Sequence, residues 1–240
     1  MSGRPFLTAR WSRLILANYT LDPALLAPWM PAGTAHDLFD GRCYVSLVGF
    51  LFDDTRLLGV PVPFHQRFEE VNLRFYVVRE ADGVRRRASV FIRELVPKPA
   101  ISWVANAVYG EHYRTVPMRH CWAEEGGQLR VSYDWKFRGR WNRLAVDAAA
   151  QAAPLQPGSE AEFITEHYWG YTRLDARRTG EYQVAHPRWE LYPVQAWTVE
   201  VDAGALYGER FAWLSQAEPA SVLLAEGSEV AVYPGKVIRE

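Results

Sequence analysis

Short runs of apolar residues, separated by turn residues, recur along the whole chain. Such runs are typical of β-strands, in which alternate residues share one face of a sheet. Asp82-Gly83 and Gly126-Gly127 each separate two runs, and pairs of this kind favour tight hairpin turns. The pattern predicts strands over residues 12–20, 43–52, 68–79, 87–96, 113–122, 128–137, 141–148, 170–174, 180–185, 193–201 and 221–232.

Helical signals are few. Asp22 followed by Pro23 predicts a short capped helix after the first strand. Residues 99–108 are apolar on most faces and precede Gly110, which predicts a second helix with a glycine stop. Because predicted strands far outnumber helices, the sequence indicates a mainly β (α+β) protein, built on a large antiparallel sheet or a closed barrel.

A third helix is predicted where Ser159 and Glu162 form a capping box, and its pattern is expected to end at Gly170. Glu162 and Glu166 are four residues apart and share a helical face, which stabilises nothing on an isolated surface helix. His167 follows, surrounded by three aromatic residues. Two interpretations stay open: the rim of a ligand cavity, with Glu166 or His167 facing inward, or a short surface helix leading into a strand.

Charged residues lie inside otherwise apolar strands. Glu70 and Arg74 share one face of residues 68–79, while Arg93 and Glu94 lie on opposite faces of the next strand. A buried unpaired charge costs several kcal/mol, so a partner is expected. We predict a Glu70–Arg93 or Arg74–Glu94 pair and one polar network that joins all four residues. Either an ion pair that locks a barrel or a charged site facing a cavity explains them.

Composition narrows the function classes. The net charge is -1 without long runs of one sign, which argues against a surface for nucleic acid or anionic membranes. No apolar run approaches the ~20 residues of a membrane helix, and the first residues lack an apolar signal segment. We therefore expect a cytoplasmic protein without membrane partners. Hydrophobic residues make up 49% of 240 positions, enough for the core of one domain over residues 1–240.

Motifs for cofactors and metals are absent from the sequence. There is no Gly-rich phosphate loop, no G-x-S-x-G elbow, no HExxH and no Cys/His zinc spacing. Even spacing places His112, Arg114 and His120 on one face of the predicted strand, and two histidines with Glu166 or His167 could hold a metal. Nothing in the spacing fixes that geometry, so neither a metal nor a cofactor is expected.

Five segments of the chain carry a family resemblance: residues 44–50, 68–74, 91–97, 162–171 and 186–189. Together they resemble the YqjF-like family, an uncharacterised domain of unknown function (2071) within the acetoacetate decarboxylase-like superfamily. The resemblance covers nearly the whole chain and implies a fold, a large cone-like antiparallel β-barrel with an internal cavity and short flanking helices. It implies no activity.

Two of the superfamily's functional motifs have counterparts here. Phe68-Glu69-Glu70 is similar to the aromatic-x-Glu motif of the decarboxylases, which implies that Glu70 is the cavity carboxylate. Residues 109–114 stand where those enzymes carry aromatic-Gly-aromatic-Pro-Lys-Lys. The resemblance then implies that Tyr113 replaces the Schiff-base lysine and Arg114 its neighbour.

This replacement argues against lysine chemistry. The chain has three lysines, Lys98, Lys136 and Lys236, and none lies between the first two. A Schiff base needs a neutral amine, obtained by desolvation or by a cationic neighbour, and an arginine cannot supply one. None of the three lysines lies in a sequence context that predicts the apolar enclosure needed to lower the pKa of an amine. We therefore expect no Schiff-base mechanism.

Two functions remain. In the first, the barrel cavity binds a small organic acid or carbonyl compound, with acid/base chemistry open. In the second, the protein is non-catalytic, its barrel is filled, and its many Trp and Tyr residues serve packing or a homo-oligomer. A cavity volume separates the two. For the first function the candidates are Glu70, His112 and Tyr113 for proton transfer, and Arg74, Arg93, Glu94, Arg114, Glu166 and His167 for ligand binding.

Overall fold

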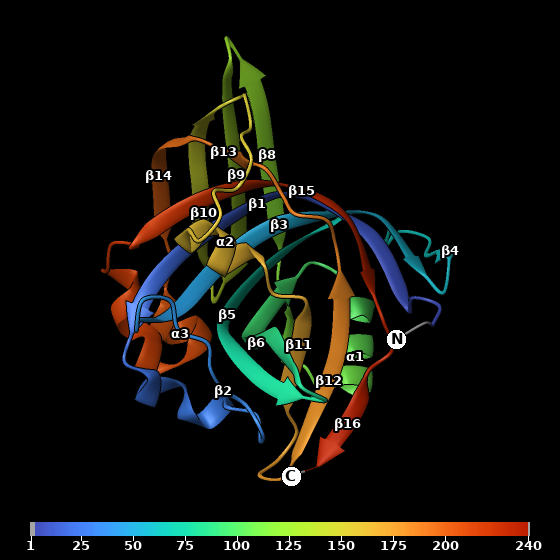
Figure 1. Ribbon diagram of the computed structural model, residues 1–240. Helices are drawn as coiled ribbons and strands as arrows, with labels where there is room; N and C mark the ends of the chain where they lie inside the picture. Colours follow the sequence, from blue (N-terminus) through green and yellow to red (C-terminus); the bar gives the residue numbers. More distant parts are fainter. Residues whose placement is uncertain (1–2, 240) are drawn as a thin grey trace.

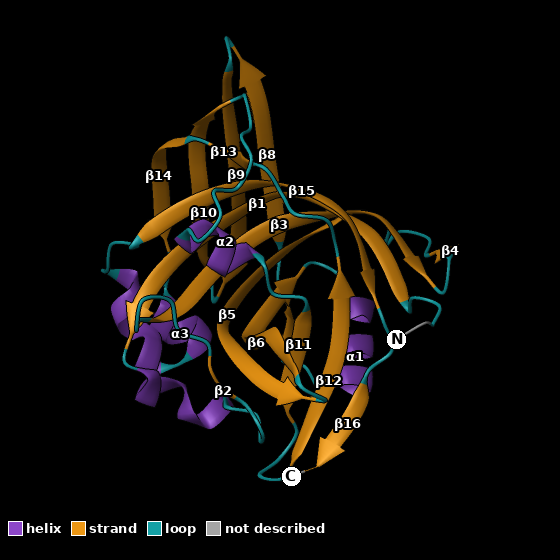
Figure 2. Cartoon of the chain, in the orientation of Figure 1, coloured by secondary structure: helices purple, strands orange, loops and turns teal. Residues whose placement is uncertain are grey.

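The computed structural model describes residues 3–239, with the backbone alone at positions 108 and 109. Strands make up most of this part of the chain, with short helices around them (Figure 2). The strands are β1 (Leu7–Leu21), β2 (Ala35–His36), β3 (Cys43–Leu57), β4 (Val60–Pro61), β5 (Phe68–Ala81), β6 (Val84–Val96), β7 (Tyr113–Thr115), β8 (Met118–Glu125), β9 (Gln128–Phe137), β10 (Arg140–Ala149), β11 (Trp169–Arg173), β12 (Arg178–Ala185), β13 (Leu191–Tyr192), β14 (Val194–Glu200), β15 (Ser221–Val232) and β16 (Lys236–Arg239). The helices are α1 (Pro99–Tyr109), α2 (Glu160–Thr165) and α3 (Ala203–Tyr207), with two 3-10 helices, η1 (Pro23–Trp29) and η2 (Glu209–Ser215).

The larger sheet closes on itself. Its hydrogen-bonded path runs β15-β1-β3-β5-β6-β11-β12, and β12 pairs again with β15 at Val184↔Val232 and Ala185↔Ala231. The strongly curved strands of this ring surround an interior (Figure 1). Most pairings are antiparallel, but β11 and β7 each run parallel to β6. The mainly β class predicted from the sequence is confirmed, with parallel pairings that the sequence did not indicate.

A second sheet, in the order β14-β10-β9-β8, projects from the ring at the top of Figure 1. Its base packs on β1 and β3. A Cβ on Gly49 of β3 would lie 3.0 Å from Cδ2 of Tyr133 in β9, so the two sheets touch where β3 has no side chain. The Tyr133 hydroxyl donates to the Arg13 carbonyl oxygen over 2.9 Å.

Alternation along the ring strands divides the core. In β3, Val45, Leu47 and Leu51 face one apolar cluster, which continues into the second sheet and the C-terminal helices. Val48 and Phe50 face the other cluster, inside the ring and against α2. Both faces of β3 are therefore buried, as its long apolar run requires. No helix within residues 3–239 has the length and apolar character needed to cross a membrane.

The predicted strand over residues 113–122 is interrupted, although its second part pairs with β9 across Gly126-Gly127 as predicted. The chain leaves the large sheet after β7 and enters the second sheet at β8, with Val116 and Pro117 between them. Proline has no N–H for a strand ladder, so one sheet cannot continue through it. The Pro117 carbonyl instead accepts from the Lys136 N–H over 2.9 Å. His112, Arg114 and His120 therefore do not share one strand face.

The predicted helix over residues 159–170 is too long. Its capping side chain is confirmed, because Ser159 Oγ accepts from the Glu162 N–H over 3.2 Å. The helix ends at Thr165, and Gly170 lies in β11, where it pairs with Tyr182. A Cβ at Gly170 would meet the Tyr182 ring at 2.1 Å. This glycine therefore makes room for a side chain and does not end a helix.

We expect Gly227→Ala to disrupt the β1–β15 pairing. Gly227 has φ +84°, and a Cβ there would lie 2.0 Å from the Trp11 carbonyl oxygen, which is backbone and cannot turn away. The expected loss of unfolding free energy in urea is about 3 kcal/mol or more. Gly139→Ala is the matched control, because it has the same φ of +84° with nothing within 4 Å. The control should lose only about 1–2 kcal/mol, and equal losses would contradict the clash.

Candidate functional site

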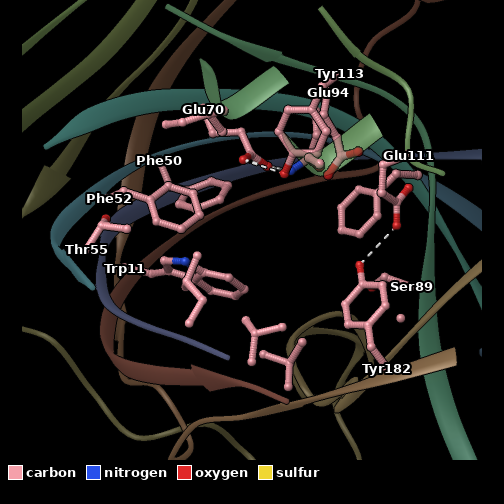
Figure 3. Close-up of a pocket in the computed structure, with 18 of the residues that line it drawn as sticks. Trp11, Phe50, Phe52, Thr55, Glu70, Ser89, Glu94, Glu111, Tyr113 and Tyr182 are labelled. Atoms are coloured by element: carbon pink, nitrogen blue, oxygen red, sulfur yellow. Dashed lines mark hydrogen bonds between the residues drawn. The ribbon is translucent and has the colours of Figure 1, made fainter. Parts of the chain in front are cut away.

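The ring encloses a cavity of about 260 Å³. Figure 3 shows side chains from several ring strands around a central open space. Glu70, Glu94 and Tyr113 lie on one side of this space, and Trp11 and Phe52 face it from another. The interior of the ring is therefore not filled with side chains, as the non-catalytic interpretation assumed.

Three glutamates among the described lining residues bring their carboxyl groups to this cavity: Glu70 in β5, Glu94 in β6 and Glu111 before β7. All three are buried. Alternation places Glu70 and Asn72 on the inner face of β5, and Asn72 is paired with Glu94 across the hairpin. Asn72 Nδ2 donates to Glu70 Oε1 over 2.9 Å. Glu111 follows Gly110, whose left-handed conformation ends α1 and turns the chain inward.

Two tyrosines connect the carboxyl groups. The Tyr113 hydroxyl donates to Glu70 Oε2 over 3.1 Å and also hydrogen-bonds the Glu94 carboxyl group. The Tyr182 hydroxyl, from β12, donates to Glu111 Oε1 over 3.3 Å (Figure 3). Tyr113 therefore joins two of the glutamates in one chain of hydrogen bonds.

Burial raises the pKa values of these three carboxyl groups above that of an exposed glutamate. Desolvation raises the pKa of Glu70 to about 7 and that of Glu111 to about 7. The pKa of Glu94 is raised well above 4.5 by burial and then by the nearby charges of Glu111 and Glu70. Glu94 therefore holds its proton more tightly than an exposed glutamate does, while Glu70 and Glu111 gain and lose protons near neutral pH.

Several polar atoms of the site have no hydrogen-bond partner among the described residues. They are Glu94 Oε2, Glu111 Oε2, Asn72 Oδ1 and Arg74 Nε. Leaving a buried donor or acceptor unpaired costs about 1–3 kcal/mol. A site with both donors and acceptors unpaired fits a ligand that carries both kinds of group.

Arg74 is the one arginine among the described lining residues, and none of them is a lysine. The side chain is buried on β5, four residues after Glu70 and on the same face of the strand. Its charge lowers the pKa of the Glu70 carboxyl group. Its guanidinium lies 5.7 Å from the centre of the Tyr76 ring. Because burial raises the pKa of its neighbour Glu70 to about 7, Arg74 is only partly neutralised near neutral pH and is a buried cation available to an anionic group.

A second polar group at the cavity is His167. Its Nε2 lies 3.2 Å from Asp37 Oδ2, and Arg85 and Arg87 also bind Asp37. Burial alone would raise the pKa of Asp37, but hydrogen bonds from His167 and Arg87 lower it to about 2. Burial, with Arg87 and Arg74 nearby, lowers the pKa of His167 to about 4. The imidazole is therefore neutral and donates from Nε2, while Nδ1 has no partner among the residues described.

The predicted network of charged residues forms only in part. Glu70, Arg74 and Glu94 line the cavity, but Arg93 does not. Arg93 faces the other side of β6 and donates to the Leu206 carbonyl oxygen. Neither predicted ion pair, Glu70–Arg93 or Arg74–Glu94, is present among the described residues. A bulge in β6, where Ile92 is left without a partner between Phe91 and Arg93, shifts the register that the prediction assumed.

Other sequence candidates also lie elsewhere. His112 lines a separate pocket with Trp29 and Arg173. Arg114 lies over the Phe137 ring, 4.6 Å from its centre. Glu166 accepts from the Tyr168 hydroxyl over 2.5 Å and is absent from the described cavity lining, whereas the adjacent His167 is part of it.

The histidines that the sequence analysis considered as metal ligands lie in different parts of the structure. His112 lies in the separate pocket, and His120 bonds Glu69 Oε1 over 2.7 Å from the second sheet. Within residues 3–239 no group of three His, Cys, Asp or Glu side chains is arranged to hold a metal ion.

The sequence analysis missed Glu111, Tyr182 and Asp37 as site residues. Glu111 had a usable signal, because it directly follows the Gly110 helix stop and precedes the candidate Tyr113. Tyr182 becomes visible only once β12 is paired with β11, where it lies opposite Gly170. Asp37 has no local signal, since it reaches His167 across 130 positions of the sequence.

The three lysines lie away from the carboxyl groups. Lys98 is the residue before α1, Lys136 faces the Trp141 ring, and Lys236 Nζ lies 3.2 Å from Glu181 Oε1. None of them belongs to the described lining of the cavity. The site can therefore donate, accept and relay protons, and it can hold an anion at Arg74, through groups other than an amine.

We expect Glu111→Gln to change how stability depends on pH. The pKa of Glu111 rises from 4.5 to about 7 on folding, so between these values the folded state keeps a proton that the unfolded chain releases. The stabilising contribution is complete below pH 4.5 and is lost as the pH rises to about 7. At pH 8 the variant should be more stable than the parent by roughly 3 kcal/mol, from 1.36 kcal/mol per unit.

Urea unfolding at pH 4.5 and pH 8 measures this difference. Glu124→Gln, at an exposed position of β8, is the control for loss of one carboxyl group. His167 has the opposite slope below neutrality, because its pKa is lowered on folding, so only the difference between variant and parent is compared. Identical pH profiles for Glu111→Gln and the parent would refute a buried proton on Glu111.

Three comparisons place the chain among known proteins. Its fold is similar to acetoacetate decarboxylase from Legionella pneumophila subsp. pneumophila str. Philadelphia 1, with a TM-score of 0.64, 12% identity, and coverage of 98% of this chain and 87% of that one. It is also similar to the enduracididine biosynthesis enzyme MppR complexed with pyruvate (TM-score 0.66, 12% identity, 99% and 91% coverage). An acetoacetate decarboxylase-like enzyme from Sphingomonas wittichii RW1 gives a TM-score of 0.61 at 14% identity, covering 100% and 95%. At these identities the likeness concerns the fold alone.

Sequence relationships define the family. The protein YqjF of Bacillus subtilis (strain 168), itself described as uncharacterised, is 29% identical over 68 residues, a match that spans 28% of this chain and 28% of YqjF. The model of the family DUF2071, described as an uncharacterised conserved protein, matches residues 8–229. The chain therefore belongs to the DUF2071 family.

Proposed function

We propose that the cavity binds a small organic acid that also carries a carbonyl group, and that the carboxyl groups move protons on it without a covalent amine intermediate. The observation that carries this proposal is the buried arrangement of Arg74 with Glu70, Glu94 and Glu111 around one space. The likeness in fold to a protein complexed with pyruvate supports this ligand class.

The ligand carboxylate is assigned to Arg74. Its Nε is unpaired in the described chain, and a guanidinium binds a carboxylate through parallel N–H bonds. The carbonyl oxygen is assigned to Glu94, because burial raises its pKa well above 4.5 and its Oε2 has no partner among the described residues. Three ionised carboxylates would repel an anion, so the raised pKa values of the cluster are what make the site compatible with an acid.

The chemistry that follows is proton transfer beside the carbonyl group. Glu70, with a pKa of about 7, takes a proton from the carbon next to the carbonyl. Glu94 gives its proton to the carbonyl oxygen, so a C–H bond and a carboxyl O–H bond break while two O–H bonds form and a neutral enol results. Tyr113 hydrogen-bonds both glutamates and returns the proton from Glu70 to Glu94.

Deuterium exchange tests this proposal with pyruvate as the probe. Loss of the methyl proton signal of pyruvate in D2O, followed by NMR, should be faster with the protein than without it. Glu94→Gln should slow the exchange by about 10²-fold or more, because a positioned acid contributes 10²–10⁴-fold. Arg74→Gln should raise the pyruvate concentration needed for half-maximal exchange about tenfold or more.

Arg114→Gln removes a guanidinium outside the cavity and is the control for Arg74→Gln. It should leave the exchange at the parent level. Exchange no faster than in buffer, together with no pyruvate binding by calorimetry, would refute the proposed function.

Borohydride trapping gives a separate expectation. The three lysines lie outside the described cavity lining, so incubation with pyruvate or acetoacetate followed by borohydride should leave the protein mass unchanged. A stoichiometric adduct on one lysine would overturn the mechanism and restore Schiff-base chemistry.

A further inference from the structure

The cavity continues beyond the carboxyl groups along an apolar wall. Strand register defines its course: Phe50 in β3 is paired with Glu70, Phe52 is paired with Phe68, and Leu57 is paired with Leu7 at the ends of the strands. All of these residues line the cavity. The wall therefore starts beside Glu70 and runs along β3 away from it.

This wall is long compared with a three-carbon acid. Seven residue steps separate Phe50 from Leu57, which at 3.3 Å per residue of strand is roughly 20 Å. The cavity volume is about 260 Å³, and a water molecule occupies about 30 Å³ of the liquid. Pyruvate has only six heavy atoms and, with its carboxylate on Arg74 and its carbonyl on Glu94, would leave most of this space unfilled.

The side chains of the wall fit an apolar body. The Trp11 ring lies 5.2 Å from Phe50, 5.8 Å from Phe52 and 6.3 Å from Trp189, measured between ring centres. Aromatic faces of this kind pack against alkyl chains and rings and hold water poorly. Trp11 Nε1 has no partner in the described part of the chain, so an oxygen on the ligand body would also find a donor here.

We propose that the ligand is an oxo acid with a hydrophobic body, an alkyl chain of several carbons or an aromatic ring, which lies along the wall from Phe50 to Leu57. This inference rests on the proposed function, which supplies the oxo acid head group. The polar end of the cavity then sets the chemistry, and the apolar wall selects the size and character of the ligand.

A series of 2-oxo acids with one head group tests the proposal: pyruvate, 2-oxohexanoate, 2-oxooctanoate and phenylpyruvate. Each buried methylene should strengthen binding about fourfold. We expect 2-oxooctanoate to bind at least ~100-fold more tightly than pyruvate in calorimetry. Octanoate has a chain of the same length without the keto group and should bind more weakly than 2-oxooctanoate.

Two variants locate the effect on the wall. Val62 is a half-buried lining residue on the loop before β5, and Val62→Trp should fill part of the apolar space. The affinity ratio of 2-oxooctanoate to pyruvate should then fall towards one. Trp103→Ala is the control, because Trp103 is 73% exposed on α1 and is not among the described lining residues. It should keep the parent ratio, and thermal melting checks that both variants fold.

The outcomes separate this inference from the proposed function. Oxo acids that bind equally whatever their chain length would overturn the hydrophobic body and leave the proposed function in place. Octanoate that binds as tightly as 2-oxooctanoate would keep the apolar wall and refute the carbonyl head group. Failure of every oxo acid to bind, with octanoate also inert, would refute both.

Discussion

The site depends on keeping buried carboxyl groups uncharged in a space with little compensating positive charge. Glu70, Glu94 and Glu111 come from different segments, and each is buried. An enclosure that excludes bulk water raises the pKa values of Glu70 and Glu111 to about 7 and that of Glu94 well above 4.5. That enclosure exists because β12 pairs with both β11 and β15 and completes the ring. The same pairing brings Tyr182 to Glu111, so the strand that closes the ring also supplies a residue of the site.

The parts of the fold predicted from the sequence are those with a local cause. The hairpin over Phe68–Val96 follows from alternation and Asp82-Gly83, and with the resemblance it led to Glu70 as a cavity residue. Strand pairings far apart in the sequence leave no such pattern, because they rest on backbone hydrogen bonds that every residue type makes. The order of the ring, its parallel pairings and Tyr182 were therefore out of reach. Arg93 was misplaced by one bulge, which is enough to reverse the face of a side chain.

His167 shows how a residue can be predicted through a wrong element. The sequence indicated a helix up to Gly170, with His167 on its face, but the helix ends at Thr165. The chain then crosses to β11, and His167 is held by Asp37 and by stacking on Tyr76 at 4.4 Å between ring centres. The cluster of polar and aromatic residues in the sequence contains two residues that line the cavity, His167 and Trp169, and both kinds of side chain are typical of ligand pockets.

Tyr113 connects the family resemblance to the chemistry of this cavity. By resemblance it stands at the position of a Schiff-base lysine, and in the structure it lies between Glu70 and Glu94. A lysine there would pair with these carboxyl groups as an ammonium ion and would hold them ionised. A tyrosine is neutral, and burial raises its pKa well above 10, so Tyr113 adds no positive charge to the cluster, although its hydrogen bonds lower the pKa values of Glu70 and Glu94. With a tyrosine at this position, Arg74 is the positive charge nearest to Glu70, and the pKa values of the cluster are set mainly by burial.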